Sequence, residues 1–160
     1  MRKYIVIVLC WVLCLSGCRD KNENERQVEL KKYVFSGLNA CIMEKPKYLS
    51  VKYDSIWVPS QQEVQNGLNA AYQYLLDNKE KNEKIVEIIS LAKQYTIQVV
   101  GINVNGKKTI YFNFFNAKIK SRYSNAEEEK RIEGGGANFW QIKYNVEKNE
   151  CFDFEVNGNG

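Results

Sequence analysis

The feature that most constrains the fold is a change from helical spacing to strict apolar alternation after Thr96. The alternation continues on both sides of the dipeptide Asn105-Gly106. An Asn-Gly pair between two alternating runs is a strong signal for a β-hairpin with a type I′ turn. A two-residue loop places Val99 opposite Phe112, so one face of the hairpin is wholly apolar. We expect that face to pack on helices.

The end of the chain contains a second pair of alternating runs, "FWQIKYNV" and "ECFDFEV", joined by residues 147–149. A three-residue loop places Lys143 opposite Asp153, which is a favourable opposite-charge pair. The same register predicts an apolar face made of the pairs Trp140–Val156, Ile142–Phe154 and Tyr144–Phe152. A two-residue loop would mix apolar and polar side chains on both faces, so the longer loop is favoured. Cys151 then lies on the polar face.

Helical spacing predicts three helices before these hairpins. The clearest follows Pro59, because Ser60 and Glu63 are spaced as a capping box. Its apolar row consists of Val64, Leu68, Ala71, Tyr72 and Leu75. A second helix is expected from Ile85, and another over 28–43. We therefore expect an α+β fold, with helices followed by two β-hairpins that form an antiparallel sheet of about four strands packed on a helix.

The composition argues against several classes of function. The chain contains no histidine, which excludes Ser-His-Asp and Cys-His catalysis and every metal site with an imidazole ligand. Without residues 1–17, 21 basic side chains face 19 acidic ones, a net charge of +2. The chain is thus close to neutral and lacks the dense stripe of Lys and Arg expected for a nucleic-acid-binding protein. We expect no metal, no cofactor and no nucleic-acid partner.

The N-terminus has the pattern of an export signal. A short basic start is followed by about fourteen mostly apolar residues, too few to cross ~30 Å of hydrocarbon as a helix. The run ends in "LSGC", residues 15–18, which resembles the lipobox of bacterial lipoproteins. The resemblance implies that residues 1–17 are a signal peptide and that Cys18 carries acyl chains which anchor the protein in a membrane. An ordinary secretory peptide and an uncleaved anchor are the alternatives.

The segment after Cys18 contains charged and polar residues only. Residues 18–27 include "RDKNENERQ", which cannot bury apolar surface, so we expect a flexible tether and then one α+β domain over 28–160. Asp20 resembles the early acidic export signals of surface lipoproteins in Bacteroidetes-type bacteria. The expected location is the cell envelope, with periplasmic and surface placements both open.

Two cysteines, Cys41 and Cys151, remain in the expected mature domain. In an oxidising compartment they can form a disulfide that closes a loop of about 110 residues, worth roughly 4 kcal/mol in the chain-entropy model. Two separate thiols are the alternative. We favour the disulfide. A catalytic cysteine is not expected, because no histidine is present to activate it.

The stretch "QVVGINVNGKKTIYFNFF" together with "GGGANFWQIKYNVEKNECFDFEVNG" resembles a family of small uncharacterised bacterial lipoproteins and secreted proteins, over about residues 59–158. The order of elements is also similar to cystatin-like or NTF2-like layouts. These resemblances imply export and the α+β fold. They imply no catalytic residues.

The candidate binding surface consists of Glu133, Gly134, Gly135, Gly136 and Trp140. A tight turn that directs the following aromatic residues is the main alternative for the glycines. Asp153 and Glu155 form a carboxylate pair that suits hydrolysis, although a solvated polar face is favoured.

Two classes of function therefore stay open. The first is a non-catalytic envelope lipoprotein that binds a protein, peptide or glycan. The second is a small enzyme based on carboxylates or on Tyr and Lys side chains.

Overall fold

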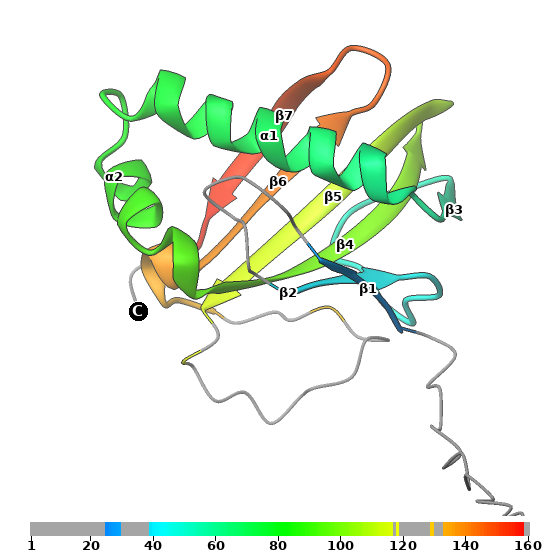
Figure 1. Cartoon of the computed structure of the whole chain (residues 1–160), viewed down its shortest axis with the longest axis horizontal. Coiled ribbons are helices and arrows are strands. Elements are labelled where there is room, and N and C mark those ends of the chain that lie inside the picture. The colour runs from blue at the N-terminus through cyan, green and yellow to red at the C-terminus, as the bar shows by residue number, and fades with distance from the viewer. Residues whose placement is uncertain (1–24, 30–38, 117, 119–128, 130–132, 159–160) are drawn as a thin grey trace, which may run out of the picture.

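The Asn105-Gly106 turn joins the two longest strands, β4 (Tyr95–Val104) and β5 (Lys107–Asn116), in a computed structural model of the protein (Figure 1). Both turn residues have positive φ, 51° and 74°, as a type I′ turn requires. Val99 pairs with Phe112, so the predicted register is confirmed.

The structure describes residues 25–29, 39–116, 118, 129 and 133–158, with side chains from residue 40 onward. The remaining strands are β1 (Glu25–Glu29), β2 (Asn39–Met43), β3 (Ser55–Trp57), β6 (Phe139–Asn145) and β7 (Glu150–Val156). The helices are α1 (Gln61–Asn78) and α2 (Glu83–Ser90), with short 3-10 turns at Ala92–Gln94 and Gly136–Asn138.

All seven strands belong to one mixed sheet. Six of them follow the order β1-β2-β4-β5-β6-β7, and β3 pairs with the far part of β4. The pairing is antiparallel except between β2 and β4, which run parallel. The α+β class is therefore confirmed, although the sheet is larger than the four strands expected from the sequence.

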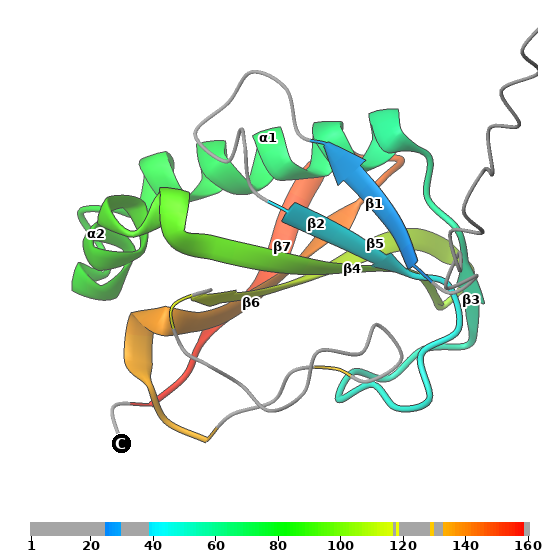
Figure 2. The ribbon, with the colours of Figure 1, turned by 60° about the horizontal axis from the view of Figure 1, so that its bottom comes forward.

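Both helices cover the same face of the sheet (Figure 2). The capping box at the start of α1 is confirmed, because Ser60 and Glu63 bond to each other's backbone N–H groups. Gly67 lets α1 approach β5 closely, since a Cβ there would lie 2.7 Å from Cζ of Phe112. The core lies between these layers and includes Val64, Leu68, Ala71, Leu75, Ile85, Ile88, Val99, Phe112, Phe114, Trp140 and Ile142.

The opposite face of the sheet has a smaller apolar cluster and a polar network. The cluster consists of Met43, Leu49, Val100, Ile102 and Tyr111, with Val51 and Val104 partly buried beside it. The segment between β2 and β3 thus covers part of the face that the helices leave open. The central strands of the sheet are therefore buried on both faces.

The helix predicted over 28–43 is wrong where the structure describes that range. Residues up to 29 belong to β1 and residues from 39 belong to β2, which pair antiparallel. Ala40 and Ile42 face the helices while Met43 faces the other side. Because both faces of β2 contact apolar residues, its sequence lacks the polar positions that would have revealed a strand. β1 also includes residues 25–27, which were expected in the tether.

The β6–β7 hairpin differs from its predicted register near the turn. Trp140 pairs with Val156 as expected, but Tyr144 pairs with Cys151 instead of Phe152. The loop is one residue longer than predicted, and a bulge between the two ends corrects the shift. Asp153 lies at this bulge with φ of +48° and still bonds to Lys143 at 2.9 Å.

The slipped register turns Cys151 toward the helices, where it packs against the main core. Cys41 lies between two helix-facing residues and so points to the opposite face. Four strand spacings of about 4.8 Å separate β2 from β7, roughly 19 Å in all. A disulfide requires Cα atoms within about 7 Å. The predicted Cys41–Cys151 bond is therefore wrong for this arrangement, and both residues are thiols.

Candidate functional site

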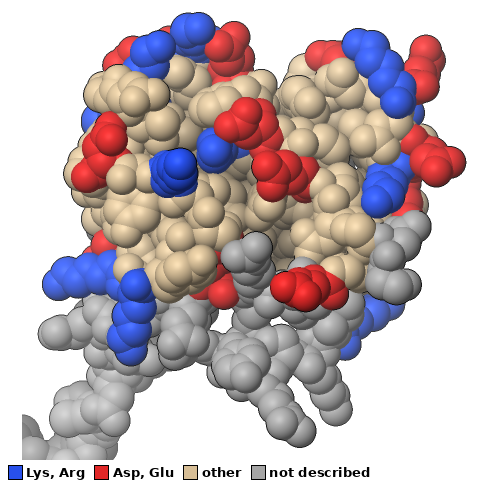
Figure 3. Space-filling model, turned by 180° about the vertical axis from the view of Figure 1, so that it is seen from behind, with Lys and Arg blue, Asp and Glu red and all other residues tan. Residues whose placement is uncertain are grey.

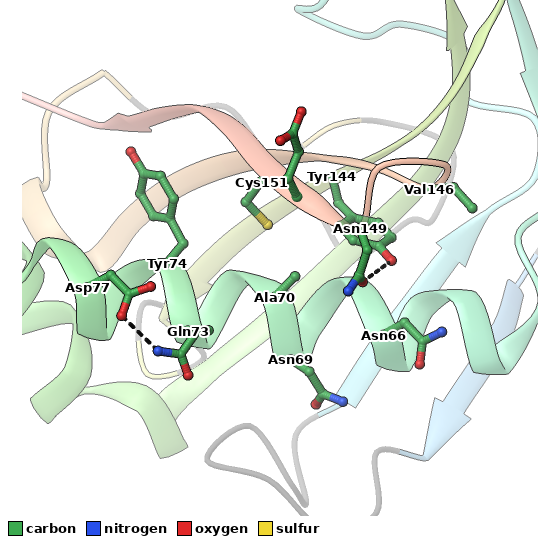
Figure 4. Close-up of a pocket in the computed structure, with 11 residues that line it drawn as sticks. Asn66, Asn69, Ala70, Gln73, Tyr74, Asp77, Tyr144, Val146, Asn149 and Cys151 are labelled. Atoms are coloured by element: carbon green, nitrogen blue, oxygen red, sulfur yellow. Dashed lines mark hydrogen bonds between the residues drawn. The ribbon is translucent and has the colours of Figure 1, made fainter.

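A cavity of about 760 Å³ opens between α1 and the end of the β6–β7 hairpin (Figure 4). We call it the helix–hairpin cleft. Its α1 side consists of Asn66, Asn69, Ala70, Gln73, Tyr74 and Asp77. Its hairpin side consists of Tyr144, Val146, Asn149, Glu150 and Cys151.

Helical spacing explains how α1 forms one wall of the cleft. Val64, Leu68, Ala71 and Leu75 face the sheet, and the positions at 66, 70, 73 and 77 lie on the next row around the helix. At 1.5 Å rise per residue, this row extends over about 16 Å. The cleft is therefore an elongated groove that follows α1.

Hydrogen bonds fix several side chains of the cleft. Gln73 donates through Nε2 to Oδ1 of Asp77 at 2.7 Å, and the Tyr144 hydroxyl donates to Oδ1 of Asn149 at 2.8 Å (Figure 4). Asn66 and Asn69 also accept through Oδ1, from glutamines one turn earlier on α1. Within the described residues, the Nδ2 groups of these three asparagines donate no hydrogen bond, so they are available to a ligand.

The floor of the cleft contains a thiol and a phenol in their neutral forms. Burial raises the pKa of the Cys151 thiol to about 12. Burial also raises the pKa of the Tyr144 hydroxyl, and the neighbouring Cys151 and Glu63 add to this effect. Because a thiol with such a pKa is protonated near neutral pH, Cys151 is not activated as a nucleophile.

The charges in the cleft are acidic. Asp77 and Glu150 are exposed carboxylates, and the eleven residues that form the cavity include no lysine or arginine. Lys148, which is not one of the eleven, pairs with Glu150 at 3.3 Å, so Asp77 carries most of the acidic character. An anionic ligand would meet like charge here, whereas a neutral ligand with hydroxyl groups would find carboxylate acceptors and amide donors. The chemistry of the lining therefore favours a neutral, hydroxyl-rich ligand.

A second cavity of about 680 Å³ lies on the sheet face that the helices leave open. We call it the sheet-face groove. Glu129 accepts bonds there from the backbone N–H (2.5 Å) and the hydroxyl (2.7 Å) of Ser50, and from the Tyr111 hydroxyl. Tyr111 also lies 2.7 Å from Oε1 of Gln141. Burial, with Glu129 adding to it, raises the pKa of Tyr111 well above its usual range, so the phenol is neutral.

The sheet-face groove collects part of the candidate binding surface predicted from sequence. Glu133 and Gly134 line it, together with Lys143 and Glu155. Lys143 bonds to Asp153, and Glu155 accepts from Nε2 of Gln141 at 2.7 Å.

Glu133 and Glu155 of the groove and the neighbouring Asp153 are exposed, whereas Glu129 is half-buried where it bonds to Ser50 and Tyr111. Figure 3 shows acidic and basic side chains interspersed on the side of the molecule that is turned away in Figure 1. The two carboxylates therefore lie on a solvated polar strand face, where Asp153 pairs with Lys143 and Glu155 accepts a hydrogen bond from Gln141.

The other residues of that predicted surface are structural. Gly134, Gly135 and Gly136 all have positive φ, between 53° and 86°, and form a tight turn. A Cβ at Gly135 would lie 2.7 Å from the Phe139 ring, so the turn directs the start of β6. Trp140 is 1% exposed and stacks on Phe114 in the core. Its assignment to a binding surface is wrong, whereas its place on the apolar face of the hairpin is confirmed.

Sequence reasoning missed the helix–hairpin cleft. The amides at positions 66, 69 and 73 formed part of no predicted site, and the wrong loop length placed the hairpin residues in other positions. A signal was nonetheless present. The α1 sequence carries seven Asn or Gln side chains but a single Glu and a single Asp, unlike the charged surface typical of an exposed helix.

The chain matches no protein-family model, and no curated protein or solved structure matches it significantly. Cys18, the predicted lipid attachment site, lies outside the described residues. The described helices include none that is long and apolar enough to cross a membrane. No cluster of three or more Cys, Asp or Glu side chains in the described ranges is arranged to hold a metal ion.

Proposed function

We propose that the protein is a lipid-anchored, non-catalytic binding module of the cell envelope, and that the helix–hairpin cleft binds a neutral glycan. The observation that carries the proposal is the lining of the cleft, where amide donors, carboxylate acceptors and tyrosines follow one elongated groove without any cation. We also infer that the layout of one long helix across an antiparallel sheet is cystatin-like or NTF2-like, and that the chain belongs with the small bacterial lipoproteins it resembles.

A glycan fits this lining better than the other ligand classes left open by the sequence. Each sugar hydroxyl both donates and accepts, and the cleft supplies both partners through Asn69, Gln73 and Asp77. Tyr74 adds an aromatic ring with one polar end. A peptide in the same groove would find apolar contact at Ala70, Val146 and the Tyr74 ring, so peptide binding is the main competing outcome of the test.

The alternative of a small enzyme has less support. The described tyrosines and cysteine with clearly shifted pKa values, namely Tyr95, Tyr111, Tyr144 and Cys151, are all shifted toward the neutral form. The carboxylates near Lys143 are exposed and bonded to neighbouring side chains. Convergent, buried titratable groups, which an active site needs, are not assembled among these residues.

The lipid anchor is tested by metabolic labelling with a fatty acid. The unchanged protein should incorporate the label and the Cys18→Ala variant should not. Equal labelling of the two proteins would refute the anchor.

Glycan binding is tested by applying the purified protein to an array of neutral and anionic oligosaccharides. We expect binding to neutral members, and a loss of affinity of about tenfold for Gln73→Ala, because one hydrogen bond to a ligand is worth about 1–1.5 kcal/mol. Gln61→Ala is the matched control, since Gln61 is an exposed glutamine on the same helix outside the cleft.

Two results would contradict the proposal. Binding that is equally weakened by Gln61→Ala and Gln73→Ala would place the ligand elsewhere. Binding confined to peptides, measured with an extended peptide library on the same two variants, would replace the glycan with a peptide in the cleft.

A further inference from the structure

One end of the molecule brings together three segments that are distant in sequence. β1 begins there, because Glu25 pairs with Met43 at the end of β2. The β4–β5 turn lies at the same end, where Asp54 donates its backbone N–H to Asn103 at 2.8 Å and accepts from Gly106 at 3.4 Å. Figures 1 and 2 show β3 and the start of β1 together at this end, and the α1–α2 turn at the other.

This end has an unusual concentration of exposed aromatic and basic side chains. Four large hydrophobic side chains are exposed in the described part of the chain, and Tyr48, Tyr53 and Val58 lie here at 59%, 40% and 44% exposure. We define the tether-end surface as Lys45, Lys47, Tyr48, Lys52, Tyr53, Lys107 and Lys108, all exposed. Figure 3 shows basic side chains, coloured blue, projecting at the lower left of that view.

The segments that form this surface are basic along the sequence. Their five lysines are accompanied by two acidic residues, Glu44 and Asp54, which leaves a net charge of +3 over these segments. In space, Lys52 also lines the sheet-face groove with Glu129, Glu133 and Glu155, and Lys108 lies near enough to Glu63 to help lower the pKa of that carboxyl. Asp54 is itself bonded to the backbone of the β4–β5 turn. The whole chain from Cys18 onward carries only +2, so the remainder of it is close to neutral or slightly acidic.

The length of chain before β1 limits how far this end can be from a membrane. Six residues lie between Cys18 and Glu25, which makes seven Cα–Cα steps, and an extended chain spans at most about 3.6 Å per step. If Cys18 is at the bilayer surface, β1 begins within about 25 Å of it. Lys45 and Lys47 follow closely after Met43, the strand partner of Glu25, so this part of the tether-end surface is held near the lipid headgroups.

We propose that the tether-end surface docks on the anionic headgroups of the bilayer in which Cys18 is anchored; this inference rests on the lipid anchor of the proposed function. A lysine near an anionic membrane surface is attracted to it, and tyrosine is favoured at the membrane–water interface. A basic patch beside an acyl anchor is the usual combination for stable membrane attachment.

Docking in this way would set the orientation of the domain. α1 starts at this end, directly after Val58, and runs away from it for 18 residues, about 27 Å. Gln73 and Asp77 therefore lie toward the far end of the helix. The α1 side of the helix–hairpin cleft would extend away from the lipid. Its hairpin side begins beside the tether-end surface, where Val146 donates its backbone N–H to the carbonyl of Lys108 at 3.1 Å.

The test uses the full lipidated protein purified from membranes and inserted into vesicles of phosphatidylcholine, alone or mixed with phosphatidylglycerol. Hydrogen exchange is measured for residues 44–58 and 105–108. We expect exchange in these segments to slow several-fold in the mixed vesicles only, and to recover at high salt because salt screens the headgroup charge. The combined variant Lys45→Glu, Lys47→Glu, Lys52→Glu should lose this protection.

A matched control carries the same charge change at the other end, as Lys79→Glu, Lys81→Glu and Lys93→Glu, all exposed. It should keep the protection of the unchanged protein. Equal exchange in the two kinds of vesicle, protection that survives the first variant, or loss of protection in the control would each overturn the docking proposal. Association with the vesicles is checked first by flotation in a density gradient. A protein that floats with neither kind of vesicle would refute the lipid anchor instead, so the two proposals can fail separately.

Discussion

Replacement of Trp140 by alanine tests whether this side chain belongs to the core or to a binding surface. Trp140 is 1% exposed, and its ring stacks on Phe114 with centroids 3.7 Å apart and planes 7° from parallel. It also makes an edge contact with Tyr95 at 5.9 Å. Truncation of a buried tryptophan costs about 3–5 kcal/mol, and a stacked aromatic pair adds about 0.5–1.5 kcal/mol beyond burial. We therefore expect a loss of about 4–5 kcal/mol.

The free energy of unfolding is measured by urea titration followed by far-UV circular dichroism, because the substitution removes a tryptophan fluorophore. The melting temperature should fall by about 10 °C or more, given roughly 2–4 °C per kcal/mol for a chain of this length. Trp140→Phe keeps one ring in the stack and should cost about 1–2 kcal/mol. It provides a measurement even if the alanine variant does not fold.

Tyr48→Ala is the control, since Tyr48 is 59% exposed and its loss should change stability by no more than about 0.5 kcal/mol. A Trp140→Ala variant within about 1 kcal/mol of the unchanged protein would refute the core placement. The surface role suggested by the sequence would then be restored.

Two further predictions test local features. Ser60→Ala should destabilise the protein by about 1 kcal/mol through loss of the cap. Burial tends to raise the pKa of Glu63, but its bonds with Ser60 outweigh this and leave it below the ordinary 4.5. The contribution of the Glu63 carboxylate is present above pH 4.5 and disappears as pH falls through the lowered value, whereas the bond from the Glu63 N–H to the Ser60 hydroxyl does not titrate. The stability gap between the two proteins should therefore narrow in acid, and an unchanged gap would contradict a contribution from the carboxylate. For the cysteines, unfolded, unreduced mature protein should show two reactive thiols, and none would restore the disulfide. In the native protein, the alkylation rate of Cys151 should keep rising about tenfold per pH unit above pH 9, and a plateau near 9 would contradict its burial.

The sequence predicted those parts of the fold in which local chemistry and pattern agree. The Asn105-Gly106 turn fixed the register of β4 and β5, because only residues that tolerate positive φ fit a type I′ turn. The capping box fixed the start of α1 in the same way. Each of these depends on contacts between residues close in sequence, so one segment carries the whole signal.

The wrong predictions concern segments whose structure is set by contacts with residues distant in sequence. β2 is a strand because β4 and β1 pair with it, and its apolar residues on both faces gave a spacing that also fits a helix. In the last hairpin, two compensating irregularities, a longer loop and the bulge at Asp153, kept the outer pairs in place while moving Cys151 to the opposite face. A pattern of period two cannot reveal a bulge in advance.

By itself, the sequence determined the α+β class, the first hairpin, the capped helix and the absence of histidine chemistry. Only the tertiary structure decided that Trp140 is core, that Cys41 and Cys151 lie on opposite faces, and that α1 and the β6–β7 hairpin together form a cleft. The physical reason is that a cleft is made by the packing of two elements some seventy residues apart. The side chains that line it satisfy the rules for an exposed helix and a polar turn equally well, and only the position of the two elements brings them to face one another.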